Sequence, residues 1–348
     1  MSCLPENSGS VWAALGPPSL LEVLVPLRDE HARWGETRLI PGGASDIEGV
    51  VRSLAGRRAS LLVIEDTGEV SGRSGYTSPF HDGAGDDNVL LGWLQLDRLE
   101  LAAYVDRAAA ILRRRHDEPN AVVLLAPRER RYLDLLDRLE RSAQSSPAMK
   151  LLRWSAERIR RKPLVDALRL GAGAVLYSGH GNASGWFAYG GVNIDHLCPG
   201  EPWLHDHTSA LVFSLSCNTG LMTGRASETE TRRGLAHQMI ARGVAGAVLA
   251  PSGDTMHENS RLLAKGLTGA LGRGCARLGH ILAYASSEGA SLEGYAVIGD
   301  PGLHAVSADG AALRGARVFA PASDEQNLAA MREDRTYELT CTKSRSSG

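Results

Sequence analysis

Cysteine is scarce in this sequence. The 348 residues contain five cysteines, scattered along the chain: Cys3, Cys198, Cys217, Cys275 and Cys341. A disulfide framework in a small secreted domain uses an even number of cysteines, so this odd, dispersed set predicts free thiols in a reducing compartment. The first 19 residues also lack a basic stretch followed by an apolar core, which is the pattern of a secretory signal. We therefore expect the protein to be cytoplasmic.

The sequence also lacks a strong charge of either sign and any long apolar run. Its formal net charge is −2 with 22% charged residues, which leaves no electrostatic footprint for nucleic acid. No apolar run approaches the roughly 20 residues of a membrane-spanning helix. The 43% hydrophobic content is ordinary for a globular protein and fits two domains or one large two-lobed unit. We expect neither nucleic acid nor a membrane as a partner.

Two short apolar runs stand before the most informative turns in the chain. Ala174–Tyr177 and Ala210–Leu215 do not alternate with polar residues, which predicts strands buried on both faces of a parallel sheet. A turn of small residues follows each run, with His180 in the first and Cys217 in the second. Chemistry in such sheets lies at the carboxyl ends of strands. An imidazole there can take the thiol proton, and the N–H of Gly181 can help to bind an oxyanion.

The simpler interpretation of each residue alone is structural. A lone buried cysteine usually behaves as a small apolar residue, and a lone loop histidine usually has no function; their pairing at two strand ends favours chemistry. Other cysteine-hydrolase patterns fit poorly. A nucleophile elbow needs glycine two residues before and after the nucleophile, where this chain has Leu215 and Thr219. Elbow and papain-like enzymes also place the nucleophile before the histidine, whereas His180 precedes Cys217.

Apolar runs alternate with amphipathic helical segments of 10–15 residues along the chain, which predicts parallel strand–helix–strand units. Further strands are expected at Leu20–Leu27 (or a short buried segment), Ser60–Ile64, Asn88–Leu96, Ala121–Leu125, Lys150–Trp154, Gly246–Ala250 and Tyr295–Ile298. The expected organisation is a flexible lead (1–19), an α/β lobe (20–117), a larger α/β domain (118–310) and a polar C-terminal tail (311–348). The fold class is therefore α/β.

Three motifs resemble those of one known superfamily. They are YSGHGNASGW (177–186), SLSCNTG (214–220) and IGDP (298–301), with a weaker match at 90–111. Together they resemble the gingipain-type branch of the caspase-like cysteine peptidases, and also the bacterial CHAT proteases, over about residues 60–305. The resemblance implies a three-layer α/β/α architecture with a mostly parallel sheet, in which 118–310 is the caspase-like catalytic domain and a smaller α/β lobe precedes it.

The resemblance also implies roles for individual residues. His180 would be the base, Cys217 the nucleophile, and the N–H groups of Gly181 and Cys217 the oxyanion donors. Gingipain-like enzymes place an acidic residue behind the histidine, from a loop after an early strand. The matching segment here, 74–83, has Gly75 or Tyr76 at that position. The remaining alternatives are a Cys–His dyad without an acid, or one of three nearby acids: Glu65, Asp66 and Asp82.

Substrate choice follows from the same resemblance. Many relatives take a basic residue before the scissile bond, which requires a carboxylate in the pocket. Asp254 is the first candidate, with Glu258 and Asp87 behind it, although each also fits an ordinary loop acid. Trp186, in the histidine motif, is a further candidate for substrate contact.

A metal site is the competing chemistry. One loop holds several potential ligands: His196, Cys198, His205, Asp206 and His207. Their spacing matches no common zinc signature, so we expect no metal and no cofactor.

The sequence thus predicts a cysteine endopeptidase that cleaves a protein or peptide substrate, with a basic residue before the scissile bond as the first specificity to test. An activating partner and a role in bacterial defence are expected by analogy with cytosolic relatives alone. Two alternatives stay open: a non-catalytic adaptor with a caspase-like lobe, whose Cys217 would resist iodoacetamide, and a peptide ligase or maturation enzyme with the same dyad.

Overall fold

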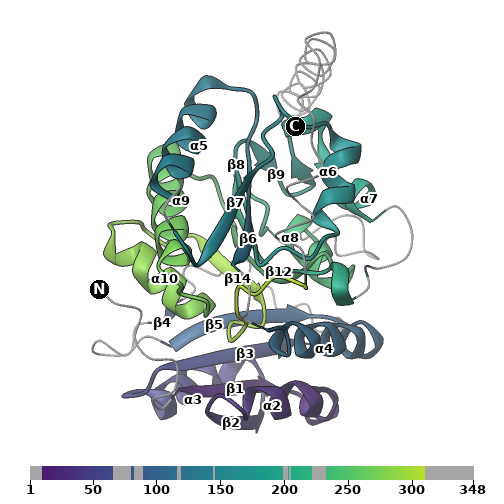
Figure 1. The fold of residues 1–348 in the computed structure, drawn as a ribbon. Helices are drawn as coiled ribbons and strands as arrows, with labels where there is room; N and C mark the ends of the chain where they lie inside the picture. Colours follow the sequence, from purple (N-terminus) through teal and green to yellow (C-terminus); the bar gives the residue numbers. More distant parts are fainter. Residues whose placement is uncertain are drawn as a thin grey trace.

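A single large sheet organises the computed structural model, which describes residues 10–65, 80–81, 89–115, 119–143, 146–198, 203, 205–221 and 233–309. In this part of the chain eleven strands form the sheet (Figure 1). Its order is β2 (Glu36–Pro41), β1 (Val11–Gly16), β3 (Ala59–Glu65), β5 (Val89–Gln95), β14 (Tyr295–Gly299), β13 (Ala245–Pro251), β12 (Ser209–Leu215), β8 (Ala174–Ser178), β6 (Asn120–Leu125) and β7 (Met149–Arg153), with β4 (Phe80–His81) beside β5. The pairs are parallel except β13–β14 and β4–β5.

Helices cover both faces of this sheet. They are α1 (Pro18–Leu21), α2 (Val25–His31), α3 (Ile47–Leu54), α4 (Arg98–Leu112), α5 (Arg130–Ala143), α6 (Arg161–Leu168), α7 (Ile194–Leu197), α8 (Leu235–Ala241), α9 (His257–Gly272) and α10 (Leu278–Ser287). Figure 1 shows α5, α9 and α10 on one side of the sheet and α6, α7 and α8 on the other. The expected three-layer, mostly parallel α/β/α fold is confirmed. None of the described helices is long and apolar enough to cross a membrane.

The central strands explain why the fold forms. Every residue of β8, β12 and β13 is buried, as their unbroken apolar runs predicted. A strand covered by helices on both faces buries its side chains along its length, so a polar one, such as Ser214 in β12, needs hydrogen-bond partners in the interior. Titratable groups are therefore expected in the turns that follow these central strands.

A small second sheet extends the turn after β8. It consists of β9 (Gly181–Asn182), β10 (Gly185–Trp186) and β11 (Val192–Asn193), paired antiparallel in the order β11–β10–β9. Because β9 begins directly after His180, this sheet fixes the path of the chain that leaves the histidine.

The N-terminal region differs from expectation. Residues 1–19 were expected to form a flexible lead, but Val11–Gly16 forms the fully buried strand β1, between β2 and β3. Residues 20–27, expected as a strand or a short buried segment, are helical and run through α1, a 3₁₀ turn and α2, with four leucines buried. Pro18 at the start of α1 favours a helix because its fixed φ suits the first turn. The leucines of this segment then bury one helical face.

The sheet runs without a break across the expected lobe boundary. Strand β5, from the expected N-terminal lobe, pairs with β14, near the C-terminal end of the expected domain 118–310. The two lobes therefore share one sheet, and the boundary between residues 117 and 118 stays a prediction. The expected tail at 311–348 lies outside the described residues.

The cysteines do not all behave as predicted. Cys198 and Cys217 are free thiols, but Cys275 is disulfide-bonded. The expectation of free thiols throughout is therefore wrong for Cys275.

A buried carboxylate fastens the last strand to the first elements of the chain. Asp300, directly after β14, is fully buried. Its Oδ2 lies 2.6 Å from His31 Nε2, and its Oδ1 accepts hydrogen bonds from Trp12 Nε1 at 2.9 Å and from the Gly302 N–H at 2.8 Å. The rings of Trp12 and His31 stack with their centroids 4.5 Å apart. One side chain thus ties β1 and α2 to β14.

The ionisation of Asp300 stabilises the fold. Burial alone raises the pKa of this carboxyl, but the charge and hydrogen bond of His31, with the hydrogen bonds from Trp12 and Gly302, bring it below its ordinary value of 3.8. A carboxyl whose pKa is lower in the folded state stabilises that state above its ordinary pKa. The contribution is lost as pH falls through the lowered value.

We expect Asp300→Asn to lower the free energy of unfolding by about 3 kcal/mol, because it leaves His31 beside an uncharged partner in the core. Denaturant unfolding at pH 7 measures this. The control is Asp29→Asn, which removes an exposed partner of Arg28 and should change stability by less than about 1 kcal/mol. The difference between wild type and Asp300→Asn should shrink below about pH 4. Equal stabilities for the two variants at pH 7 would contradict the anchoring role.

Candidate active site

The site is built on the pairing of two neighbouring strands. β8 and β12 run parallel, and Ser178 is level with Leu215. His180 and Cys217 each lie two residues beyond this pair, so both turns begin at the same edge of the sheet. This is the arrangement that the two apolar runs predicted.

The flanking strands bring further side chains to the same edge. β6 lies on the far side of β8, and β13 lies on the far side of β12. Glu129 follows β6 and Thr255 follows β13. Four adjacent strands therefore deliver, in spatial order, Thr255, Cys217, His180 and Glu129.

The imidazole of His180 is held at one ring nitrogen. Its Nε2 lies 3.1 Å from Glu129 Oε1 and 2.5 Å from Arg131 Nη2, and Arg131 also pairs with Glu129 at 2.7 Å. A single nitrogen either donates its proton to Glu129 or, when bare, accepts one from Arg131. The two residues thus compete for the same atom. The other ring nitrogen, Nδ1, is left for proton transfer.

Glu129 is ionised in this setting. The hydrogen bond with His180 lowers the pKa of the Glu129 carboxyl; burial opposes this, and the charges of His180 and Arg131 add to the lowering. A carboxylate behind an imidazole sets its orientation and stabilises its protonated form.

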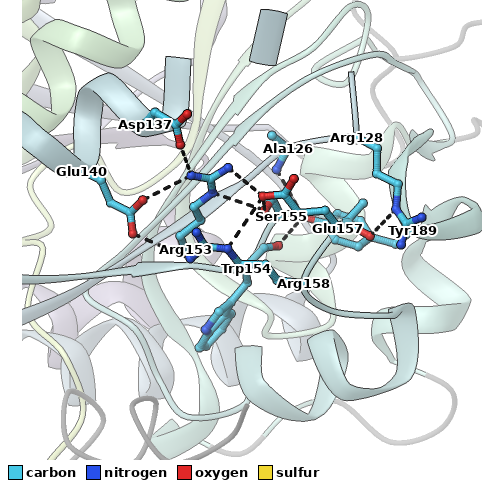
Figure 2. Close-up of polar contacts among 11 residues, drawn as sticks. Ala126, Arg128, Asp137, Glu140, Arg153, Trp154, Ser155, Glu157, Arg158 and Tyr189 are labelled. Atoms are coloured by element: carbon cyan, nitrogen blue, oxygen red, sulfur yellow. Dashed lines mark hydrogen bonds and ion pairs between the residues drawn. The ribbon is translucent and has the colours of Figure 1, made fainter. Parts of the chain in front are cut away.

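Hydrogen bonds hold the segment that presents Glu129 in place (Figure 2). Tyr189 donates its hydroxyl proton to the Trp154 carbonyl at 2.6 Å and accepts the Ala126 N–H at 3.2 Å. Arg128 Nε donates to the Ala156 carbonyl at 2.7 Å. These bonds join the turn after β6 to the turn after β7.

A buried arginine supports the same region. Arg153, whose side chain is 4% exposed, forms ion pairs with Glu140 at 3.2 Å, with Glu157 at 2.7 Å and with Asp137 (Figure 2). Two of these carboxylates come from α5, the helix that begins one residue after Glu129. The cluster therefore fixes α5 against β7 and with it the position of Glu129.

The cysteine turn is held by the loop after β13. Cys217 Sγ accepts a hydrogen bond from the Thr255 N–H at 3.5 Å. Asn218 has a φ of 60°, in the left-handed region that asparagine tolerates better than most residues. It is kept there by bonds from its Nδ2 to Asp254 Oδ1 at 2.8 Å and from its N–H to the Gly253 carbonyl at 2.9 Å. No hydrogen bond joins His180 to Cys217 among the described contacts, and such bonds are often loose without substrate.

A second histidine lies close by. Tyr132 is in edge contact with His180, with centroids 5.6 Å apart, and with His257, 5.2 Å apart. Burial lowers the pKa of His257, and the charge of Arg131 lowers it further, so this ring is neutral at pH 7. His257 was not among the site residues predicted from the sequence, because nothing local links it to His180.

Two of the predicted substrate residues are bonded to other side chains, and their role toward a substrate stays a prediction. Asp254 is exposed and holds Asn218. Glu258 is exposed and bonded to Arg261 Nε at 3.0 Å. Asp87 lies outside the described residues.

Trp186 is placed away from any substrate. Its side chain is 1% exposed, stacks on Tyr177 with centroids 4.6 Å apart, and donates to Ser214 Oγ. A buried indole of this kind cannot contact a peptide, so the expectation of substrate contact is wrong.

The acid behind the histidine comes from an unexpected part of the chain. Of the residues considered from sequence, Gly75, Tyr76, Asp66 and Asp82 lie outside the described residues. Glu65 ends β3, five strand positions from β8, or about 24 Å at the usual strand spacing, so it cannot reach His180. Glu129 contacts the ring instead. A usable signal existed: an acidic residue four positions after the predicted strand 121–125.

The metal ligands considered from the sequence can be tested where their side chains are described. Within the described ranges no group of three histidine, cysteine or acidic side chains is placed to hold a metal ion. His196 Nδ1 accepts the Asn193 N–H at 3.3 Å in the cap of α7. Cys198 is buried, and burial raises the pKa of its thiol.

Comparison with known proteins identifies the family of this chain. The model of Peptidase family C25 matches residues 97–306, which is more than half of the chain and includes His180, Cys217 and Glu129. The chain belongs to peptidase family C25. This C25 protein is a gingipain-type, caspase-like cysteine peptidase, as its motifs suggested.

Two solved structures share the fold of this C25 protein. One is the Arg specific cysteine proteinase gingipain R (RGPB), with a TM-score of 0.64 and 13% identity over 87% of this chain and 80% of that one. The other is a complex of Porphyromonas gingivalis RgpB pro- and mature domains, with a TM-score of 0.59 and 14% identity over 84% and 79%. No curated protein matches the chain.

We expect Gly181→Ala to destabilise the protein by about 1–3 kcal/mol, since overpacking at a tight contact forces the backbone apart. A Cβ at this position would lie 2.8 Å from Ser216 Oγ and 2.9 Å from the Gly185 carbonyl oxygen. Denaturant unfolding measures the change. Gly49→Ala is the matched control, because its Cβ meets nothing within 4 Å and alanine favours the helix. Equal stability of the two variants would show that the histidine and cysteine turns are not in close contact.

Proposed function

We propose that this C25 peptidase is an endopeptidase in which Cys217 is the nucleophile, His180 moves the proton and Glu129 orients the imidazole. The observation that supports this most is the in-register pairing of β8 and β12, with Glu129 bonded to the histidine from the next strand. Nucleophile, base and orienting acid then follow the usual logic of a catalytic triad.

The acylation step uses each of these groups once. The thiolate of Cys217 attacks the peptide carbonyl carbon, forming the C–S bond, and the oxyanion is bound by the N–H groups of Gly181 and Cys217. His180 then gives a proton to the amide nitrogen as the C–N bond breaks and the amine leaves. Because Glu129 holds Nε2, the proton passes through Nδ1. A water molecule, deprotonated by the same nitrogen, next attacks the thioester and frees Cys217.

Arg131 disfavours the protonated form of His180, on which this proton transfer depends. When His180 is protonated, its Nε2 has no lone pair to accept the arginine proton, and the two cations repel. At 4 Å and an effective dielectric constant of 20 that repulsion is about 4 kcal/mol, and less here because both side chains are nearly half exposed. Glu129 lies between the two cations and offsets this repulsion. We therefore assign Glu129 the task of keeping protonated His180 in place.

For specificity we propose a basic residue before the scissile bond. Gingipain R is Arg specific by its description, and Asp254 lies in the loop beside Cys217. Its Oδ1 accepts the Asn218 bond, and a carboxylate has lone pairs on a second oxygen for a cation. An activating partner is proposed as well, since the second similar structure is a complex of pro- and mature domains. The cytoplasmic location, the CHAT-like relationship and the defence context stay predictions.

We expect Glu129→Gln to lower kcat about 10–100-fold with little change in KM, because the amide keeps the shape but not the charge that balances protonated His180. Steady-state hydrolysis of a peptide substrate measures this. Glu48→Gln, on the exposed face of α3, is the control and should match wild type. An unchanged kcat in Glu129→Gln would remove Glu129 from the mechanism.

The whole proposal is tested with a proteome-derived peptide library. We expect wild type to cleave after arginine or lysine, and Cys217→Ala and His180→Ala to cleave nothing while unfolding like wild type. Cys198→Ala should stay active, because Cys198 is buried with 2% of the residue exposed. Full activity of Cys217→Ala or His180→Ala would overturn the dyad. Cleavage without a basic preference would overturn the specificity alone. A folded wild type without cleavage, and with Cys217 inert to iodoacetamide, would favour the adaptor alternative.

A further inference from the structure

A buried chain of polar groups lies beneath the two catalytic turns. Its members, each 1% exposed or less, are Trp186, Ser214, Ser216 and Thr219. Trp186 Nε1 is 2.9 Å from Ser214 Oγ, which is 2.9 Å from Thr219 Oγ1 and 3.2 Å from Ser216 Oγ. Thr219 Oγ1 is 3.1 Å from the Ser216 carbonyl oxygen. Ser214 is the member bonded to all three others.

The chain joins the two turns that hold the reacting groups. Trp186 lies on β10 and pairs with Gly181 on β9, so its indole belongs to the segment that leaves His180. Ser216 and Thr219 flank Cys217 in the other turn. Ser214, near the end of β12, contacts both sides at once. A shift of either turn therefore breaks a bond to Ser214.

The direction of every bond in this chain is determined. An indole N–H only donates and a carbonyl oxygen only accepts. Trp186 must therefore donate to Ser214, Ser214 to Thr219, and Thr219 to the Ser216 carbonyl. The Ser216 hydroxyl donates to the second lone pair of Ser214 Oγ. Each proton is used once, so the network has one arrangement and is fully satisfied, which is the condition under which buried polar networks make a structure rigid.

We propose that Ser214 is a positioning residue that couples the His180 turn to the Cys217 turn, a role that rests on the peptidase function proposed above. It does not touch substrate. Catalysis by two separate groups requires them to be held within about half an ångström of the productive geometry. Without the Ser214 hydroxyl, the Trp186 N–H and the Thr219 hydroxyl lose partners in a site closed to water, and the two turns are free to move apart.

The test compares Ser214→Ala, Trp186→Phe and their double variant with a matched control, Ser178→Ala. Ser178 is fully buried near the end of β8, and its hydroxyl has no hydrogen-bond partner among the described residues. We expect Ser214→Ala and Trp186→Phe each to lower kcat about 10–100-fold with KM changed less than about twofold. The double variant should be no slower than the slower single one, because both remove the same coupling. Ser178→Ala should match wild type.

If Ser214→Ala only destabilises the fold, its kcat per folded molecule is unchanged. Denaturant unfolding fixes the folded fraction of each variant, and kcat is compared per folded molecule. If Ser214→Ala is as active per folded molecule as Ser178→Ala, or if the two losses multiply in the double variant, the coupling role of Ser214 is wrong.

A second readout separates this proposal from the peptidase assignment. Hydrogen exchange of the Trp186 indole proton, followed by NMR, should be slow in wild type and Ser178→Ala and at least tenfold faster in Ser214→Ala. Absence of peptide cleavage by wild type with this exchange pattern would reject the peptidase function and keep the link between the turns. Cleavage by wild type with equal exchange in all variants would keep the peptidase and reject the link.

Discussion

The parallel pairing of β8 with β12 is the constraint on which the site depends. It places two turns at one edge of the sheet and fixes the register of the strands that lead to them. A shift of one residue would turn every side chain of a strand to the opposite face of the sheet. The order of the neighbouring strands then determines which residues surround the turns: those after β6 on one side and those after β13 on the other. The position of Glu129 and Thr255 is thus a consequence of strand order.

Sequence alone predicted the parts of the protein that have a local signature. The central strands are mostly apolar runs without alternation, and His180 and Cys217 stand in turns of small residues, so both were predicted without knowledge of the fold. The N-terminal strand Val11–Gly16 was missed because it is short, lies near the start of the chain and is followed by two prolines. The helical stretch at 20–27 was expected as a strand or a short buried segment. Its apolar residues are too closely spaced to distinguish the helical period of about 3.6 residues from the strand period of about two.

Contacts across the sheet could not be predicted from spacing. Glu129 meets His180 only because β6 is next to β8, and nothing in the sequence states which strands are neighbours. Trp186 was misassigned for the same reason: whether an aromatic residue in a loop is exposed depends on how the small sheet folds back over β12. Asp254 has a bond to Asn218 that depends on the pairing of β12 with β13.

The site combines two polar layers of opposite character. Charged, partly exposed groups surround His180, where Glu129 and Arg131 both lie within bonding distance of one ring nitrogen. The buried hydroxyls beneath them have one arrangement and no access to water. A charged layer held in place above a rigid buried layer suits proton transfer, because the groups that stabilise the changing charge on His180 are already oriented.

The place of β14 in the sheet has a consequence for synthesis on the ribosome. This strand comes last in the sheet's chain order, yet it is inserted between β5 and β13. Until residues 295–299 have left the exit tunnel, both neighbours present unpaired edges, which are templates for association with other nascent chains. A chain that stops before this point lacks the strand that joins the two halves of the described sheet. Its unpaired edges would then be open to pairing with other chains and to recognition by chaperones.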